Sequence, residues 1–363
     1  MMRRTFMQGA PAAAAGAGMS AAAAAGTRLG FDTYSIRDYR WKAIQLLEYT
    51  ASLKLDTIQF SSMGDYENYE PAYLQSVKDT AARHEIAIDA GTGCMCPSSK
   101  SYRADQQGDP AEYMRQGLRV AHAVGSRSMR CYMGAGADRR GPVPIEQHME
   151  TTVKVFKQVK SLAQDLDVKI ALENHSGDMQ AREVRTIIEE AGKDYVASCL
   201  DTGNPMWVVE DPMVALEILA PYVVTTHIRD SAVFEHPRGA AAQWVALGDG
   251  SIDFKAFVAR FRQLCPRASV QLEVITGRPP QVLPYLEADF WKAFPKMPAA
   301  EFARFVALAK NGHPFMGSML IGDTGGKPAP AIQAALKEQQ KLDLERSLEY
   351  AKHQLGLGIR WRT

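Results

Sequence analysis

The chain has 363 residues, of which 46% are hydrophobic and 23% charged, and its formal net charge is +1. This is the composition of an ordinary globular protein, and it excludes disordered, collagen-like and coiled-coil classes. Acidic and basic residues nearly balance, without the basic excess that nucleic-acid binding normally uses, so no nucleic-acid partner is expected. Length alone leaves open two domains of ~150 residues or one α/β barrel of ~250.

Residues 1–26 predict a twin-arginine export signal that is separate from the fold. The pair Arg3-Arg4 precedes an uncharged, Ala/Gly-rich run from Ala10 to Ala25 that offers small-x-small cleavage sites near its end. The run is too weakly apolar to span a bilayer, which takes ~20 strongly apolar residues, so no stable membrane insertion is expected. We therefore expect a periplasmic or otherwise exported protein. An uncleaved tether to a lipid surface and a misassigned start are the alternatives.

Short apolar runs alternate with helical patterns from Leu29 onward. The predicted strands are 29–31, 55–60, 86–90, 128–132, 168–173, 195–201, 222–227 and 269–273, and the clearest helices are 42–53, 145–165 and 180–191. Eight strands alternating with helices predict an α/β fold, a closed parallel (β/α)₈ TIM barrel. The glycine fingerprint of an open dinucleotide-binding sheet is missing.

Residues 27–284 account for the barrel, and 285–363 form a C-terminal helical extension. An aromatic-rich helical pattern covers 285–311, a Gly/Pro-rich loop follows at 312–330, and 331–355 predicts a final helix. Its apolar stripe is Leu344, Leu348, Ala351 and Leu355. We expect this helix to pack on the barrel, and a homo-oligomer formed through it stays open.

Five cysteines are an odd number for an oxidising compartment, so at most two disulfides could form. Cys94 and Cys96 are separated by one residue, a spacing of neither zinc ribbons nor thioredoxin motifs. We expect the cysteines to be small buried residues without a part in the chemistry.

Metal-ligand residue types end each of the last four predicted strands. They are Glu173, Asp201, His227 and Glu273. Active sites of barrels lie at the carboxyl ends of the strands, so these side chains should converge. The long interval before Glu273 is assigned to a loop at 230–250. Three carboxylates and one imidazole suit one divalent ion, Mn²⁺, Mg²⁺ or Co²⁺, with Zn²⁺ left open.

Several segments around these residues resemble the xylose-isomerase-like TIM barrels, a family of sugar isomerases, ketose 3-epimerases, hydroxypyruvate isomerase and inosose dehydratase. The matching segments are 172–175 (LENH), 200–204 (LDTGN), 226–230 (THIRD), 247–254 (LGDGSIDF) and 271–273 (QLE). The resemblance implies that Glu173, Asp201, His227 and Glu273 hold one divalent metal, with the two glutamates on either face of a bound sugar. One departure is Asn204, which stands where the epimerases usually carry a histidine that contacts a substrate hydroxyl.

The chemistry of this arrangement follows from the residue types. Moving a proton beside a ketone requires a base near the carbon and a Lewis acid on the oxygens. With Glu173 and Glu273 as the catalytic pair, one would remove the proton and the other return it, on the opposite face or at the neighbouring carbon. His227 must be neutral to ligate, so metal binding should weaken at acid pH.

Four neighbouring residues are candidates for substrate contacts besides Asn204. His175 could bond a substrate hydroxyl or cap the loop after Glu173. Arg229 and Asp230 are suggested by the resemblance as a pair that orients the substrate or the ligands, although a surface ion pair is an equal alternative. Trp207 could stack on a sugar ring or act as a hydrophobic lid contact. His84, His122, His148 and His353 are given no role.

The sequence thus predicts a divalent-metal-dependent isomerase or epimerase of a non-phosphorylated ketose or keto-sugar. Sugar phosphates are cytoplasmic, and no Gly-rich phosphate loop is present. A lyase that eliminates from keto-glycosides or keto-inositols is the alternative, and a non-catalytic sugar-binding protein is more remote. An endonuclease-type phosphodiesterase would need more strand-end histidines and a basic rim.

Overall fold

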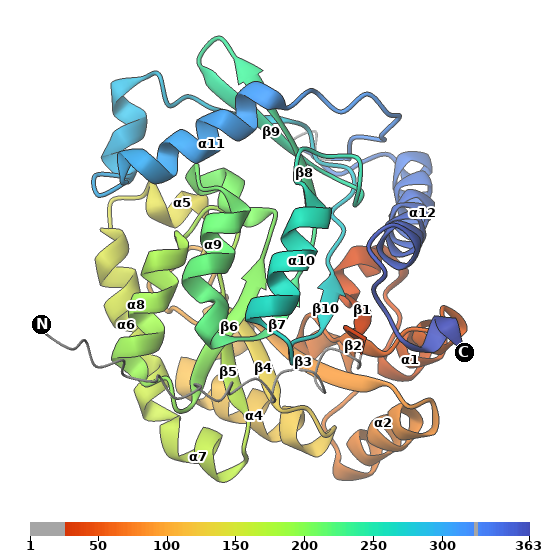
Figure 1. Ribbon diagram of the computed structural model, residues 1–363. Helices are drawn as coiled ribbons and strands as arrows, with labels where there is room; N and C mark the ends of the chain where they lie inside the picture. Colours follow the sequence, from red (N-terminus) through yellow and green to blue (C-terminus); the bar gives the residue numbers. More distant parts are fainter. Residues whose placement is uncertain (1–25, 323–325) are drawn as a thin grey trace, which may run out of the picture.

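The computed structural model describes residues 26–322 and 326–363, and its centre is a barrel of eight parallel strands (Figure 1). In spatial order they are β10 (Val270–Leu272), β1 (Leu29–Asp32), β2 (Thr57–Gln59), β3 (Ala87–Cys94), β4 (Ser128–Tyr132), β5 (Lys169–Glu173), β6 (Val196–Asp201) and β7 (Val223–His227). A parallel bridge between Ile228 and Leu272 brings the last strand beside β7. The predicted (β/α)₈ fold is confirmed.

Close approach between strands requires glycine at two points of the barrel wall. A Cβ on Gly30 would lie 2.0 Å from the carbonyl oxygen of Thr57, and one on Gly91 would lie 2.4 Å from that of Phe60. Both distances are far below any real contact, so a side chain at either position would force neighbouring strands apart.

Helices surround the barrel between successive strands. They are α1 (Ala43–Ser52), α2 (Pro71–Arg83), α3 (Ala104–Gln107), α4 (Pro110–Ala123), α5 (Gly136–Arg139), α6 (Ile145–Gln158), α7 (Lys160–Asp165), α8 (Ala181–Ala191), α9 (Pro212–Leu219) and α10 (Phe254–Leu264). The predicted helix 145–165 is two helices, α6 and α7, because the backbone of Val159 between them is not helical (φ −115°, ψ 4°). The β-branched side chain of Val159 is buried in the core at this break.

Helix α4 illustrates how the sequence determines where these helices begin and which face they bury. Asp109 accepts hydrogen bonds from the N–H groups of Ala111 and Glu112, which satisfies two donors that lack partners within the helix. Pro110 occupies the first turn, where its missing N–H costs nothing. One face then buries Met114 and Leu118 against the barrel.

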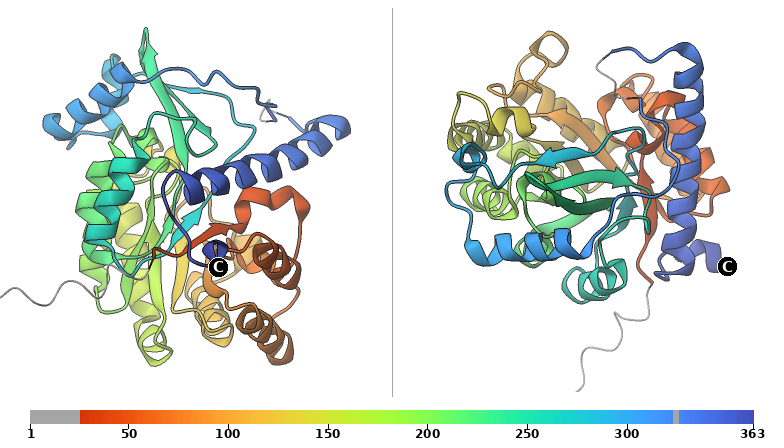
Figure 2. Two further views of the ribbon diagram at one scale, coloured as in Figure 1. Left: turned by 45° about the vertical axis from the view of Figure 1, so that its right-hand side comes forward. Right: turned by 90° about the horizontal axis from the view of Figure 1, so that it is seen from above.

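The segment 230–250, expected as a loop, is largely a β-hairpin above the carboxyl ends of the barrel strands. Strands β8 (Asp230–His236) and β9 (Gly239–Val245) pair antiparallel, and β11 (Gln281–Leu283) adds to β9. Figure 2 shows this hairpin rising above the barrel. The sequence did not reveal β9 because its first half is alanine, which has low strand propensity, and because pairing with β8 and β11 supplies the missing stability.

The C-terminal extension has two parts with different positions. Short helix η6 (Ala288–Ala293) and helix α11 (Ala299–Asn311) lie over the hairpin, where Phe305 is fully buried. Helix α12 (Pro330–His353) lies along the outside of the barrel, against η2 (Thr33–Tyr39) and β10 (Figure 2).

The final helix packs on the barrel through the stripe expected from sequence. Leu344, Leu348 and Ala351 are at most 1% exposed, and Asp343 accepts a 2.7 Å hydrogen bond from Thr276, just after β10. The helix therefore completes the outer layer next to α1.

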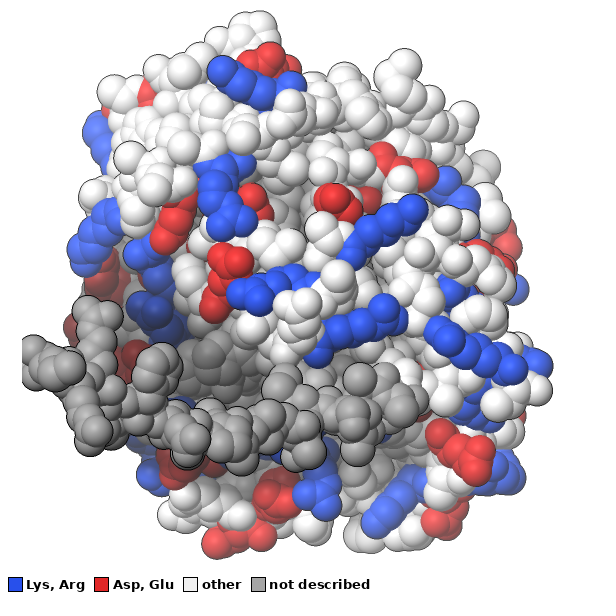
Figure 3. Space-filling view, in the orientation of Figure 1, with Lys and Arg blue, Asp and Glu red and all other residues white. Residues whose placement is uncertain are grey.

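Within the described residues, no helix combines the length and apolar character needed to cross a bilayer. Basic and acidic side chains are interspersed over the face seen in Figure 3. The predicted export signal lies outside the described residues apart from Gly26.

Candidate metal and sugar site

The four strand-end residues meet at the carboxyl mouth of the barrel. Each of Glu173, Asp201, His227 and Glu273 offers a ligand atom within 4.8 Å of the others. All four side chains are buried, the most exposed being Glu273 at 4%. Glu273 follows β10 directly, and its N–H donates to the carbonyl of Ile228, so the strand pairing that closes the barrel also fixes the position of this carboxylate.

The ring of His227 is oriented by groups on the first two strands. Its Nε2 contacts the Oε1 atom of Gln59 and lies 3.2 Å from a carboxylate oxygen of Asp32. Gln59 is itself fixed, since its Nε2 donates to Thr225 at 2.9 Å. The amide oxygen of Gln59 can only accept, so Nε2 carries the proton and Nδ1 presents its lone pair.

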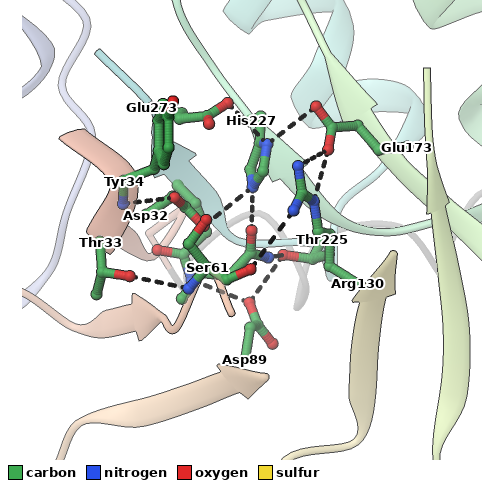
Figure 4. A network of polar contacts seen from close by, with 12 residues as sticks. Asp32, Thr33, Tyr34, Ser61, Asp89, Arg130, Glu173, Thr225, His227 and Glu273 are labelled. Carbon is green, nitrogen blue, oxygen red and sulfur yellow. Dashed lines mark hydrogen bonds and ion pairs between the residues drawn. The ribbon is translucent and has the colours of Figure 1, made fainter. Parts of the chain in front are cut away.

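Nδ1 of His227 faces the carboxylates. It lies 2.9 Å from Glu273 Oε2 and 3.2 Å from Glu173 Oε1, yet it makes no hydrogen bond of good geometry with any described residue. Figure 4 shows the imidazole with Glu173 and Glu273 on this side and Asp32 on the other. A fully buried nitrogen without a partner, aimed at a ring of carboxylates, fits a metal ligand.

Asp201 divides its two carboxylate oxygens between the loop and the site. Oδ1 accepts from the N–H groups of Gly203 and Asn204, both at 2.7 Å. Oδ2 points into the cluster, 4.0 Å from His227 Nδ1. The loop after β6 therefore holds the carboxylate in one orientation and leaves one oxygen to ligate.

Glu173 is held by Arg130 and Asn204. The Nε atom of Arg130, from the middle of β4, donates to Glu173 Oε2 at 2.5 Å, and Asn204 Nδ2 donates to Oε1 at 3.1 Å. Asn204 thus contacts a candidate ligand, while the cavity above is lined by other residues. Burial opposes ionisation, but the adjacent Arg130 guanidinium holds the pKa of Glu173 well below its usual range.

The guanidinium of Arg229 lies among the same carboxylates. Its Nη2 contacts Asp201 and Glu273 closely and lies 3.5 Å from Glu173 Oε1. Although burial opposes it, Arg229 lowers the pKa of Glu273 to about 2. Burial raises the pKa of Asp201 to about 7. A divalent cation at Asp201 would reverse that shift, because it favours the ionised carboxylate.

Charge balance supports a dication at this position. Four carboxylates, including that of Asp32, lie within 4.0 Å of the His227 ring nitrogens, and two guanidiniums, Arg130 and Arg229, pair with them. With all four carboxylates ionised and the histidine neutral, the cluster would carry two uncompensated negative charges, which is costly in a buried site unless a cation is bound. The four-residue group could hold one divalent metal ion, and its oxygen-rich donors suit a hard cation.

A cavity of about 610 Å³ opens above this cluster. Its floor includes Glu273, Arg130 and Arg229, and aromatic rings of its wall include Tyr132 and Trp244. Aromatic faces suit the C–H faces of a sugar, and the volume is that of a small-molecule site.

His175 and Trp207, both predicted as substrate contacts, occupy different environments. His175 lines the cavity, stacks on Tyr132 with ring centroids 3.9 Å apart, and contacts the carbonyl of Gly134 through Nδ1. Trp207 is 7% exposed and packs edge-on against Trp244, which lines the cavity. The T-shaped pair makes Trp207 a support for Trp244.

Asp230 points away from the cluster that Arg229 joins. Its carboxylate accepts hydrogen bonds from the N–H groups of Ser231, Gly248 and Gly250. A Cβ on Gly250 would lie 2.1 Å from Asp230 Oδ1, so the loop at 247–254 can approach only because this position is glycine. Asp230 thus anchors the loop that follows the hairpin.

Sequence reasoning missed several residues of the site, among them Asp32, Gln59, Arg130 and Trp244. The first two end β1 and β2, but the predicted strands ended one residue away, at Phe31 and Phe60, so the strand-end rule did not select them. Arg130 is a charged residue inside an otherwise apolar strand, which is costly unless paired and therefore informative. Trp244 carries no comparable signal, because its strand was taken for a loop.

Comparisons with known proteins agree with this architecture. The model of the xylose isomerase-like TIM barrel family matches residues 47–293. Among curated proteins, the chain is 26% identical over 143 residues to the uncharacterized protein YihM of Escherichia coli, and the match spans 39% of this chain and only 42% of that protein. It is 22% identical over 218 residues to the 3-oxo-isoapionate decarboxylase of Pectobacterium atrosepticum, covering 58% and 70% respectively.

Solved structures share the fold at low identity. A D-psicose 3-epimerase crystallised in the presence of D-fructose superposes with a TM-score of 0.57 at 17% identity, covering 91% of this chain and 99% of that one. The 3-keto-D-glucoside 4-epimerase YcjR of E. coli gives 0.53 at 12% identity, covering 77% and 98%. The family model matches well over half of the chain, and the protein therefore belongs to the xylose isomerase-like TIM barrel family.

Proposed function

We propose that the protein is a divalent-metal-dependent isomerase or epimerase of a non-phosphorylated ketose or keto-sugar. The observation that carries this proposal is a pair of buried glutamates, from β5 and from the end of β10, that approach the same nitrogen of His227 at the floor of a cavity. Sugar binding alone does not need two carboxylates placed around one point, whereas removal and return of a proton does.

Glu173, Asp201, His227 and Glu273 would hold the metal ion. When bound, a divalent cation supplies Lewis-acid stabilisation to the oxygens of an enediolate. One of the solved family structures, from Mycobacterium smegmatis, is a complex with magnesium, which supports a hard cation here.

Glu273 lines the cavity and is the candidate base that takes the proton from the carbon beside the ketone. Glu173 lies beneath, where Arg130 keeps it ionised in the free enzyme. It would first take a proton from a substrate hydroxyl and then deliver that proton to the other face or to the neighbouring carbon. Delivery to the other face inverts the centre, and delivery to the neighbouring carbon moves the carbonyl. Tyr132 and Trp244 would orient the ring of the sugar above the pair.

The substrate class is supported by the printed activities of two structural relatives, an epimerase of the ketose D-psicose and one of 3-keto-D-glucosides. The Arg3-Arg4 pair supports export, and an exported enzyme would meet sugars without phosphate.

A lyase reaction is the second candidate, and one observation favours it. The curated relative with the larger coverage is a decarboxylase of a 3-oxo sugar acid, a reaction that also passes through an enolate beside a ketone. The same metal and glutamates would serve both reactions, and the products distinguish them, since epimerisation conserves mass.

Incubation in D₂O with a panel of ketoses and keto-glycosides tests the proposal. The wild type should incorporate deuterium at the carbon beside the carbonyl, and Glu173→Gln and Glu273→Gln should each lower turnover by roughly 10²-fold or more, the usual contribution of a positioned general acid or base. Glu112→Gln, on the exposed face of α4, is the matched control. Turnover without solvent exchange, together with full activity of both glutamine variants, would exclude proton transfer by this pair.

A further inference from the structure

The cavity wall near its opening is basic. Five arginines line the cavity, Arg37, Arg40, Arg130, Arg229 and Arg278, against only two acidic residues, Asp65 and Glu273. Arg130 and Arg229 form ion pairs with the carboxylate cluster, and Arg278 also has an interaction partner. The remaining two arginines stand outside the cluster and need an explanation.

Arg37, in η2, meets only backbone carbonyls and an aromatic face. Its Nη1 donates to the carbonyl of Tyr34 at 3.2 Å, its Nη2 approaches that of Thr276 at 3.5 Å, and its guanidinium carbon lies 4.6 Å from the centre of the Tyr34 ring. No carboxylate of the described residues lies within ion-pair distance of it. Held from behind by carbonyls, this guanidinium keeps its charge directed at the cavity.

Arg40 occupies a backbone conformation that favours glycine. It caps η2 with φ 54° and ψ 25°, and its N–H donates to the carbonyl of Arg37. Glycine or asparagine is the usual residue in this left-handed region, so an arginine here costs some conformational energy. Within the described part of the chain its side chain has no ion-pair partner, although it lines the cavity.

We propose that the substrate is a keto-sugar acid whose carboxylate binds Arg37 and Arg40 while its carbonyl end lies over Glu273. The inference rests on the proposed function and narrows its substrate class from any non-phosphorylated keto-sugar to one that carries a carboxylate. Arg37 and Arg40 are three residues apart, both line the cavity, and neither has a carboxylate partner among the described residues, so together they can bind a planar anion; Tyr34 and Trp41 line the same cavity.

A carboxylate fits this wall better than a phosphate ester. Phosphate sites in α/β folds typically use free backbone N–H groups at a helix N-terminus after a strand. Here the segment after β1 begins at η2, and Asp32 caps it by accepting from the N–H of Tyr34 at 2.9 Å. That acidic cap occupies the donor and would repel a dianion.

Matched ligands separate these alternatives because they differ only at C6. D-fructose and D-tagatose carry a hydroxymethyl group there, D-fructuronate and D-tagaturonate a carboxylate, and D-fructose 6-phosphate a phosphate ester. Binding to the purified Mn²⁺-treated protein is measured by calorimetry at low and at 0.5 M salt. At least one uronate should bind about tenfold or more tightly than its neutral partner, and the advantage should shrink at high salt.

Variants assign the effect to the two arginines. Arg37→Gln and Arg40→Gln should each reduce the preference for the uronate over its neutral partner by about tenfold. Arg260→Gln, an exposed position on α10, is the control and should keep the preference.

Equal binding of uronates and neutral ketoses, tighter binding of the phosphate ester, or a preference unchanged in both arginine variants would each overturn the proposal. These readouts need no turnover. If the uronates show no binding preference, the deuterium-exchange test of the glutamate pair is unaffected. If deuterium exchange fails, the binding preference can still be measured.

Discussion

Gln59 provides a direct test of how the histidine is prepared for a metal. It is fully buried, accepts from His227 Nε2 and donates to Thr225. Replacing it with leucine, Gln59→Leu, removes the acceptor that fixes the protonation state of the imidazole. Partners of this kind are typically worth 10–100-fold in metal affinity.

The structure places the expected loss at the lower end of that range. After the substitution, Nε2 still has the carboxylate of Asp32 at 3.2 Å, so the imidazole loses one of two acceptors. We expect Mn²⁺ affinity to fall about tenfold, which is about 1.4 kcal/mol. Calorimetric titration of chelator-treated protein at pH 7.5 measures it.

Two further variants give this measurement its controls. Gln75→Leu, exposed on α2 and bonded only to Asp79, should leave metal affinity unchanged. Gln59→Glu preserves an acceptor for Nε2, so it should retain affinity even if Gln59→Leu packs poorly. Wild-type affinity in a Gln59→Leu protein with a native circular dichroism spectrum would refute the reasoning that Gln59 orients the ligand.

Three other predictions concern the metal, pH and export. Asp201→Ala and His227→Ala should each lose the bound divalent ion while the fold survives, and full metal content in both purified variants would exclude the assigned site. Burial raises the pKa of Glu210 from its ordinary value of 4.5 to about 8. Its contribution to stability is therefore complete below pH 4.5 and is lost as the pH rises through 8, so Glu210→Gln should raise Tm relative to wild type at pH 9 but not at pH 5. A Tm difference independent of pH would contradict this. Replacing Arg3 and Arg4 with lysine should leave full-length protein in the cytoplasm, whereas exported wild type should begin near residue 27; unchanged export would point to another route.

The barrel and its carboxyl mouth can be predicted from local patterns in the sequence. A sequence in which strand and helix patterns alternate is compatible with few topologies. Because the strands of a barrel all end at one rim, Glu173, Asp201, His227 and Glu273 are predicted to lie together from the sequence alone. The final helix was equally readable, because its stripe at 344, 348, 351 and 355 repeats with the helical period.

Tertiary structure decided what surrounds those four residues. The contact of Gln59 and Asp32 with His227 joins positions 168 or more residues apart, and no local pattern encodes such a distance. The hairpin over the mouth was hidden because strand pairing, more than the propensity of its alanine-rich half, stabilises β9. It is this pairing that brings Trp244 to the cavity and leaves Trp207 behind it. The periodicity of a helix or strand depends on residues that are close in sequence, whereas the environment of a side chain depends on which distant segments pack against it.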